Sequence, residues 1–128
     1  MTEGRLKQEL SSLLWVAVGA VPGALLRWHG GAGWTATLTA NLLASLLLGS
    51  LLPLQQRHPR MLLLVGVGFC GSLSTFSTWM LDLSEALHQG FPARALIVLI
   101  TNLAGGLLAV GMGTSLSRGW MRRAGQRR

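Results

Sequence analysis

Four long, nearly uncharged stretches constrain this chain more than any other feature of its sequence. They cover about residues 10–28, 34–54, 61–87 and 92–117. A helix needs about 20 mostly apolar residues to cross a bilayer, and each stretch meets that length. Each is continuously apolar instead of alternating, which is typical of spanning helices and not of barrel strands. We therefore expect an all-α membrane protein in which residues 1–128 form a single domain of four transmembrane helices, with a basic tail over residues 118–128.

The composition favours lipid rather than water as the solvent. Charged residues make up 12% of the chain, whereas a soluble domain carries about 25%. The net charge of +7 suggests nucleic-acid binding, because Lys and Arg neutralise phosphates. However, the basic residues border the apolar stretches or lie in the tail, so we expect no nucleic-acid partner. The single cysteine, Cys70, excludes an internal disulfide and a cysteine-based zinc site.

Basic residues are distributed unevenly between the two ends of the predicted helices. Four spans place both termini on one side of the membrane. That side carries nine of the 11 basic residues, and the other side carries Arg27 and Arg94. The nine are Arg5, Lys7, Arg57, Arg60, Arg118, Arg122, Arg123, Arg127 and Arg128. The positive-inside rule therefore predicts that both termini are cytoplasmic.

The third stretch is rich in glycine and in hydroxyl side chains. Gly66, Gly68 and Gly71 precede or border a hydroxyl cluster that is interleaved with Phe76 and Trp79. The cluster consists of Ser72, Ser74, Thr75, Ser77 and Thr78. An unbroken helix is one interpretation, because Ser and Thr can bond to carbonyls of their own helix. We favour a break in this third helix, since freed carbonyls at membrane depth are tolerated beside a cavity and tend to bind ions there.

Two asparagines, Asn41 and Asn102, lie in the middle of the second and fourth stretches. An unpaired carboxamide in hydrocarbon is unfavourable, so each amide needs partners. Hydrogen bonding between helices would satisfy them; together with the hydroxyl cluster, the two amides favour a polar pathway. The middle of the first stretch and the whole of the second carry no carboxylate, which a proton-coupled exporter needs inside the membrane. A neutral, donor-rich pathway suits a small anion better than a cation.

Catalytic constellations are missing from the sequence. It contains no paired carboxylates, no Ser–His pair and no phosphate-binding loop. His29, His58 and His88 fall in or near connecting segments and are spaced too widely for a metal motif. We therefore expect that the chain is not an enzyme.

Three local patterns carry a more specific signal. They are Gly-Ala-Leu-Leu-Arg-Trp at residues 23–28, Thr-Leu-Thr-Ala-Asn at residues 37–41, and the run from Gly68 to Thr78. In this order and spacing they resemble the Fluc (CrcB) fluoride channel family. The resemblance implies a subunit of a fluoride-selective ion channel in the bacterial inner (plasma) membrane, which mediates passive fluoride export and fluoride resistance. It also implies an antiparallel dimer, embedded in membrane lipid, with two narrow anion pathways near the subunit interface.

The resemblance assigns roles to particular residues. A structural Na+ at the dimer interface is bound by backbone carbonyls, and the matching positions are Gly71 and Ser74. Asn41 and Arg27 match polar positions of the family, and Phe76 matches the first of two phenylalanines whose ring edges face the anion. The predicted anion pathway consists of Arg27, Asn41, Thr75, Phe76, Ser77, Thr78, Trp79, Asn102 and Gly106.

Two positions depart from the family pattern. The second phenylalanine is replaced by Trp79, whose indole keeps a positive ring edge and adds an N–H but is bulkier and narrows the pathway. In the fourth stretch, Asn102 and Gly106 stand where relatives carry hydroxyls, and Gly106 offers no side-chain donor. We therefore expect that one of the two pathways is impaired.

The charge asymmetry leaves the identity of the second subunit open. An antiparallel homodimer requires one sequence to insert both ways, and nine basic residues against two favour one orientation. One hypothesis is therefore a dimer with a homologous, oppositely oriented subunit, and the rival is a homodimer with dual topology. Alternative functions are a non-conducting or half-pore partner subunit of a heteromeric channel, and a small four-helix exporter.

Overall fold

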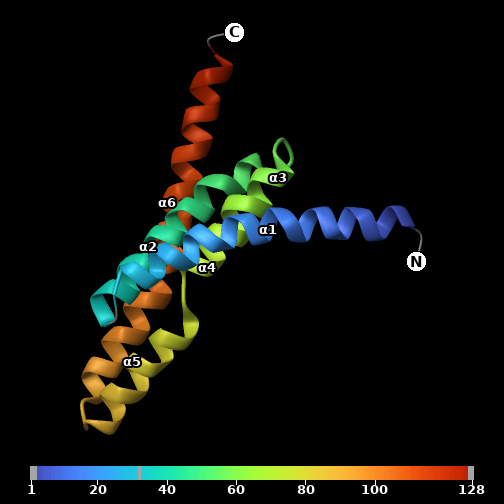
Figure 1. The fold of residues 1–128 in the computed structure, drawn as a ribbon. Coiled ribbons are helices and arrows are strands. Elements are labelled where there is room, and N and C mark those ends of the chain that lie inside the picture. Colours follow the sequence, from blue (N-terminus) through green and yellow to red (C-terminus); the bar gives the residue numbers. More distant parts are fainter. Residues whose placement is uncertain (1–2, 32, 127–128) are drawn as a thin grey trace.

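The computed structural model describes residues 3–31 and 33–126, which form helices joined by short turns (Figure 1). The segments are α1 (Glu3–His29), α2 (Trp34–Leu51), η1 (Leu52–Leu54), α3 (Pro59–Met61), η2 (Leu62–Cys70), α4 (Gly71–Leu73), α5 (Phe76–His88) and α6 (Pro92–Gly125). No strand occurs among these described residues. Four helical runs are long and apolar enough to cross a membrane: Glu3–His29, Trp34–Leu54, Pro59–His88 and Pro92–Gly125. The prediction of an all-α membrane protein with four spanning helices is confirmed.

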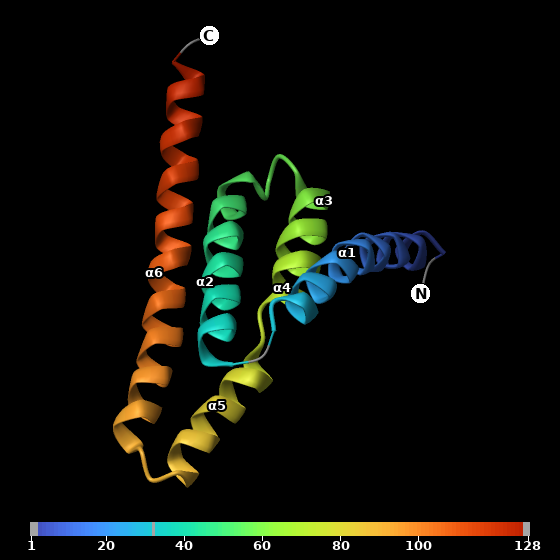
Figure 2. The same ribbon diagram turned by 60° about the vertical axis from the view of Figure 1, so that its left-hand side comes forward.

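The helices pack in two pairs that are held together by α2. α2 lies along α6, and α1 crosses the run formed by η2 and α4 (Figures 1 and 2). α5 leans on the first half of α6, and α2 also contacts η2 and α5. The turns beside Gly31, Gly33 and Gly90, which all have positive φ, lie at the lower left of Figure 1, away from both ends of the chain.

Glycines set the closest approaches between helices. A Cβ at Gly19 of α1 would overlap the backbone carbonyl of Leu64 in η2. A Cβ at Gly49 of α2 would overlap the backbone of Val110 in α6. Lipid provides no hydrophobic force between helices, so such close backbone contacts supply much of the packing. Large apolar side chains point outward instead, as Leu107 does with 75% of its surface exposed.

The third apolar run changes conformation twice. Residues Leu62–Cys70 are wound as a π-helix, which is rare in proteins and is frequently found at functional sites. After α4, Ser74 (φ −72°, ψ 152°) and Thr75 (φ −143°, ψ 125°) have extended backbones, and α5 begins at Phe76. Figure 2 shows α5 leaving this point in a new direction, toward α6. The interruption lies in the hydroxyl cluster that the sequence singles out.

Candidate functional site

The side chain of Asn41 bridges the interruption between α4 and α5. Its carbonyl Oδ1 accepts the backbone N–H of Thr75 at 2.8 Å. Its amide Nδ2 donates to the backbone carbonyl of Thr75 at 3.3 Å and to Oδ1 of Asn102 at 3.0 Å. These three bonds use both amide hydrogens and the carbonyl of Asn41. Asn41 therefore joins α2 to the extended segment and to α6.

The side chain of Asn41 accepts a backbone N–H, that of Thr75, which in a continuous helix would bond within the helix. In an α-helix, the N–H of Thr75 would donate to the carbonyl four residues earlier, that of Gly71. Because the Thr75 N–H points to Asn41 instead, the Gly71 carbonyl is approached by the hydroxyl of Ser74, at 3.4 Å. Gly71 and Ser74 are both exposed on the surface of the subunit. The interruption thus leaves a weakly bonded carbonyl on an exposed face.

Three hydroxyl groups form a connected run at the start of α5. Thr75 Oγ1 is 3.3 Å from the hydroxyl of Ser77 and 3.1 Å from that of Thr78. The backbone N–H of Thr78 also donates to Thr75 Oγ1, so Thr75 caps the helix. The three side chains have three hydroxyl protons, but only two hydroxyl–hydroxyl hydrogen bonds join them. One O–H therefore remains free to donate elsewhere.

The two aromatic residues of the predicted pathway differ in exposure. The ring of Phe76 is 69% exposed, whereas Trp79 is 6% exposed. Their ring centroids are 5.1 Å apart with an interplanar angle of 70°, which is an edge-to-face contact. The indole N–H of Trp79 donates to the backbone carbonyl of Val98 in α6 at 3.3 Å. The extra donor that tryptophan brings is therefore used to fasten α5 to α6.

These side chains line an open groove of about 230 Å³ on the subunit surface. Its walls are Asn41, Ser45, Ser74, Thr75, Phe76, Trp79, Asn102 and Leu103. Five of the nine predicted pathway residues thus meet in one place, although they come from α2, the interruption, α5 and α6. Asn102 donates one amide hydrogen to the carbonyl of Val98 at 3.0 Å, which leaves its second hydrogen available. The groove is neutral and carries hydrogen-bond donors.

Sequence reasoning missed two lining residues, Ser45 and Leu103. Ser45 has the small size that suits helix packing, and its position on the same face of α2 as Asn41, one turn further along, is the signal that points to the groove. A Cβ at Gly106 would lie 3.6 Å from the Ser45 hydroxyl oxygen. Gly106 therefore continues the groove wall along α6, one turn after Asn102.

Arg27 lies apart from this groove. Its guanidinium donates to the carbonyl of Gly31 at 3.1 Å and to the hydroxyl of Thr37 at 3.2 Å. Thr37 is fully buried, so this bond ties the end of α1 to the start of α2. Arg27 lines a different pocket, of about 400 Å³, together with Leu26 and Thr39. The structure brings Arg27 to the end of the bundle but not to the groove.

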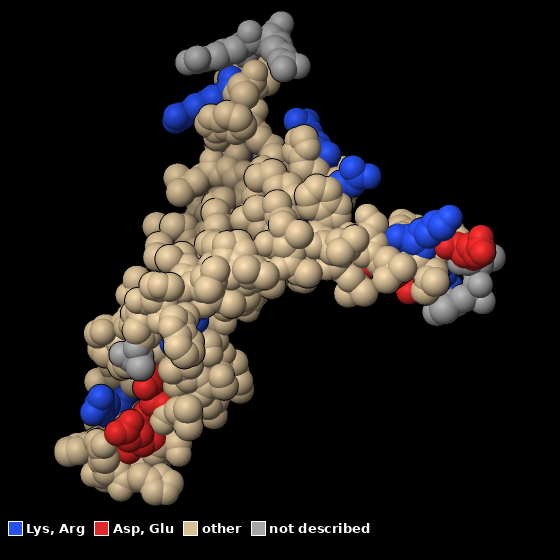
Figure 3. Space-filling model, in the orientation of Figure 1, with Lys and Arg blue, Asp and Glu red and all other residues tan. Residues whose placement is uncertain are grey.

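The acidic residues lie away from the groove. They are Glu3 and Glu9 at the start of α1, and Asp82 and Glu85 on α5. In Figure 3, red atoms accordingly appear on the right-hand arm and at the lower left. Within the described part of the chain, no group of three or more His, Cys, Asp or Glu side chains is arranged to hold a metal ion. A cation near the interruption would therefore depend on backbone oxygens.

Comparison with known proteins identifies the family to which this four-helix chain belongs. Residues 14–114 match the family described as CrcB-like protein, Camphor Resistance (CrcB). "Fluoride-specific ion channel FluC 2" of Parasynechococcus marenigrum (strain WH8102) is 49% identical, over 88% of this chain and 86% of that protein. "Fluoride-specific ion channel FluC 1" of Prochlorococcus marinus (strain MIT 9313) is 37% identical, over 81% of this chain and 90% of that protein. "Fluoride-specific ion channel FluC" of Ruegeria pomeroyi (strain ATCC 700808 / DSM 15171 / DSS-3) is 36% identical, over 89% of this chain and 96% of that protein. Since the family match spans most of the four-helix chain, this protein belongs to the CrcB-like family.

Proposed function

We propose that this chain is a subunit of a fluoride-selective ion channel that exports fluoride passively and confers fluoride resistance. The names of its relatives support fluoride as the transported ion. The observation that carries the proposal is the neutral groove, whose walls include the amide of Asn102, the Thr75 end of the hydroxyl run and the ring of Phe76. Neither an enzyme nor a nucleotide-driven pump is required, because the negative membrane potential drives an anion out of the cell.

The groove chemistry fits a small, hard anion. Fluoride gives up strongly bound water on entry, so hydrogen-bond donors must replace that water. The second amide hydrogen of Asn102 is such a donor in the groove wall. The free O–H of the hydroxyl run adjoins the groove, because the run is bonded to Thr75 of the groove wall. The exposed ring of Phe76 adds a positively polarised edge. Carboxylates are absent from the groove walls, so no fixed negative charge repels the anion.

The groove belongs to an incomplete pathway in a single subunit. It is open, and most of the Phe76 ring lies at the subunit surface. A second subunit that covers this face would enclose the anion between two walls. We therefore propose that the chain forms an antiparallel dimer in the bacterial inner membrane, and the excess of basic residues at one end supports a cytoplasmic position for both termini.

The region around Gly71 and Ser74 fits a structural Na+ at the dimer interface. Hard cations bind oxygen ligands, and the Gly71 carbonyl has lost its helical partner to Asn41. A Cβ at Gly71 would meet no atom within 4 Å, so the approach to this backbone is open. When bound, the ion would supply positive charge that joins the interrupted helices of two subunits. Since the ligands are backbone carbonyls, Ser74→Ala is expected to leave the Na+ dependence of dimer stability unchanged.

Phe76→Ile tests the pathway directly. We expect fluoride efflux from liposomes that contain only this chain, measured with a fluoride electrode, and loss of that efflux in the variant. The protein should still fold, because the Phe76 side chain is largely exposed in the subunit. Phe91→Ile is a matched control, since Phe91 is 56% exposed and lies before α6, outside the groove. Fluoride efflux in Phe76→Ile equal to that of the unaltered chain would refute the pore assignment, and chloride efflux measures selectivity.

A second candidate function is that of a partner subunit in a heteromeric fluoride channel. The uneven charge distribution favours it, and so does Gly106, which places no donor opposite Ser45. Some relatives are named FluC 1 and FluC 2, which is consistent with paired genes. Cysteines introduced near Gly30 and at Arg118 would report orientation through membrane-impermeant labelling. Labelling of each site from one face only supports the heteromer, and equal labelling from both faces supports the homodimer.

A further inference from the structure

One end of the molecule is strongly basic and has no carboxylate beside it. Arg57 and Arg60 lie in or next to the connection between η1 and α3, and further arginines follow on the last turns of α6. These are Arg118, Arg122 and Arg123. Figure 3 shows their blue atoms at the upper end with no red atoms nearby. The only ion pair in the described part of the chain joins Arg5 to Glu9 on α1, so no described carboxylate is paired with the upper arginines.

Two apolar grooves meet at this end. The first has a volume of about 430 Å³, and Trp15, Met61 and Leu64 form its apolar wall. Arg57, His58 and Arg60 line it as well. Trp15 comes from α1 and Leu64 from η2, so the groove follows the contact between two spanning helices.

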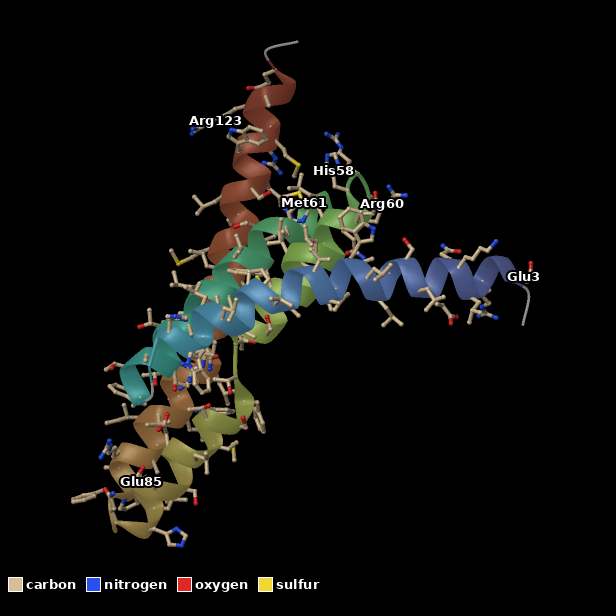
Figure 4. All side chains as sticks on the ribbon, in the orientation of Figure 1. Glu3, His58, Arg60, Met61, Glu85 and Arg123 are labelled. Carbon is tan, nitrogen blue, oxygen red and sulfur yellow. The ribbon has the colours of Figure 1, made fainter. Side chains whose placement is uncertain are left out.

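The second groove lies on the other side of the same connection. It has a volume of about 420 Å³ and is walled by Leu54, Trp120 and Met121. Arg57 and His58 line it as well, so these two side chains stand between the two grooves. Figure 4 shows His58 and Arg60 at the top of the bundle, with Arg123 on the adjoining α6.

This combination is the chemistry of a phospholipid site. Arginines bind phosphate oxygens through several donors, and apolar grooves between helices accept acyl chains. Tryptophan prefers the membrane–water interface, which is where Trp15 and Trp120 lie if the apolar runs span the bilayer. Basic pockets between spanning helices bind anionic lipid headgroups. A nucleic acid has no apolar chain to fill the grooves.

We propose that the basic end of this subunit is a binding site for an acidic phospholipid. Its phosphate lies against Arg57 and His58, and its acyl chains follow the two grooves. Arg60, which also lines the first groove, adds a further donor, and the arginines of α6 add long-range attraction. This site is separate from the anion groove, whose lining residues it does not share.

Lipid retention by the purified, full-length protein tests the proposal. The protein in mild detergent is mixed with phosphatidylglycerol and phosphatidylcholine that carry the same acyl chains, and bound lipids are counted by native mass spectrometry. We expect preferential retention of phosphatidylglycerol, and a loss of about 30-fold in R57Q/R60Q, as follows for two interfacial arginines. R5Q/K7Q removes the same charge from the α1 arm and should retain the lipid as the unaltered chain does. Equal retention of the two lipids, or equal losses in the two variants, would overturn the proposal.

Two further measurements distinguish this lipid site from a free-phosphate site and from lipid bound elsewhere on the subunit. Inorganic phosphate at millimolar concentration should not displace the lipid; displacement would assign the site to free phosphate instead. In vesicles, phosphatidylglycerol brominated on its acyl chains should quench tryptophan fluorescence of the unaltered protein more than brominated phosphatidylcholine does. That excess should vanish in W15F/W120F, because Trp28, Trp34 and Trp79 lie outside both grooves. Persistence of the excess in this variant would place the lipid elsewhere and refute the site.

Discussion

Asn41→Leu removes the side chain that holds the interruption of the third apolar run. Leucine has a similar volume, so the packing of α2 changes little, but three hydrogen bonds disappear. The N–H and C=O of Thr75 and the Oδ1 of Asn102 then lack their present partner. Hydrogen bonds inside membranes contribute about 0.6 kcal/mol each, and unpaired polar groups cost about 1–3 kcal/mol each. Three such bonds together contribute about 2 kcal/mol, so we expect a loss of at least about 2 kcal/mol in the stability of the observed conformation.

The expected functional effect follows from this free energy. If the anion passes only while Thr75 is extended, a loss of about 2 kcal/mol lowers the ratio of the conducting to the competing conformation roughly 30-fold. Fluoride efflux from liposomes measures the flux, and unfolding in detergent measures the stability. Ser50→Ala is the control on the same helix, because its hydroxyl bonds only to the Leu46 carbonyl of α2 itself, at 2.9 Å.

A second variant separates the two partners of Asn41. Asn102→Leu removes the amide pair but leaves the two bonds between Asn41 and Thr75. It should therefore destabilise the subunit less than Asn41→Leu does. Efflux and stability in Asn41→Leu equal to those of Ser50→Ala would refute the claim that this side chain maintains the interruption.

Four other substitutions probe the helix packing and the groove. Trp79→Phe keeps the aromatic ring but loses the N–H bond to Val98, so we expect a loss of about 1 kcal/mol in thermal unfolding with efflux retained; abolished efflux would contradict this. Gly49→Ala forces a methyl group into the α6 backbone and should abolish the monodisperse peak in size-exclusion chromatography, whereas Gly71→Ala meets open space and should keep it. Gly106→Ser adds a hydroxyl donor, and its Cβ would lie at an ordinary contact distance from the Ser45 hydroxyl oxygen. We expect faster fluoride efflux, and an unchanged rate would remove this position from the pathway.

The four spanning helices were predictable from the sequence because lipid offers the backbone no hydrogen-bond partners. Backbone groups in hydrocarbon must be paired within the segment, so long apolar runs become helices. The helices extend beyond the predicted spans: α1 begins at Glu3 and α6 ends at Gly125. The water-exposed ends hold good helix formers, which hydropathy does not register.

The candidate site was predictable as a set of residues but not as an arrangement. Polar side chains in apolar stretches stand out, which is why Asn41, Asn102 and Thr75 were found. Their mutual bonds join residues 34 and 61 positions apart, and no local pattern specifies such pairing. Likewise, the π winding of η2 and the use of the Trp79 N–H by Val98 depend on how neighbouring helices pack.

The bonds around the groove connect into one frame. Asn41 ties α2 to the interruption and to Asn102, and the Val98 carbonyl receives both the Asn102 amide and the Trp79 indole. α2, α5 and α6 are thus fastened at one level of the bundle. Side chains that belong to this frame have few donors left, whereas Phe76 and the hydroxyl run face outward. In the proposed dimer, this frame would hold one wall of the pathway in place before the second subunit arrives, so dimerisation would have little side-chain order to impose on this wall.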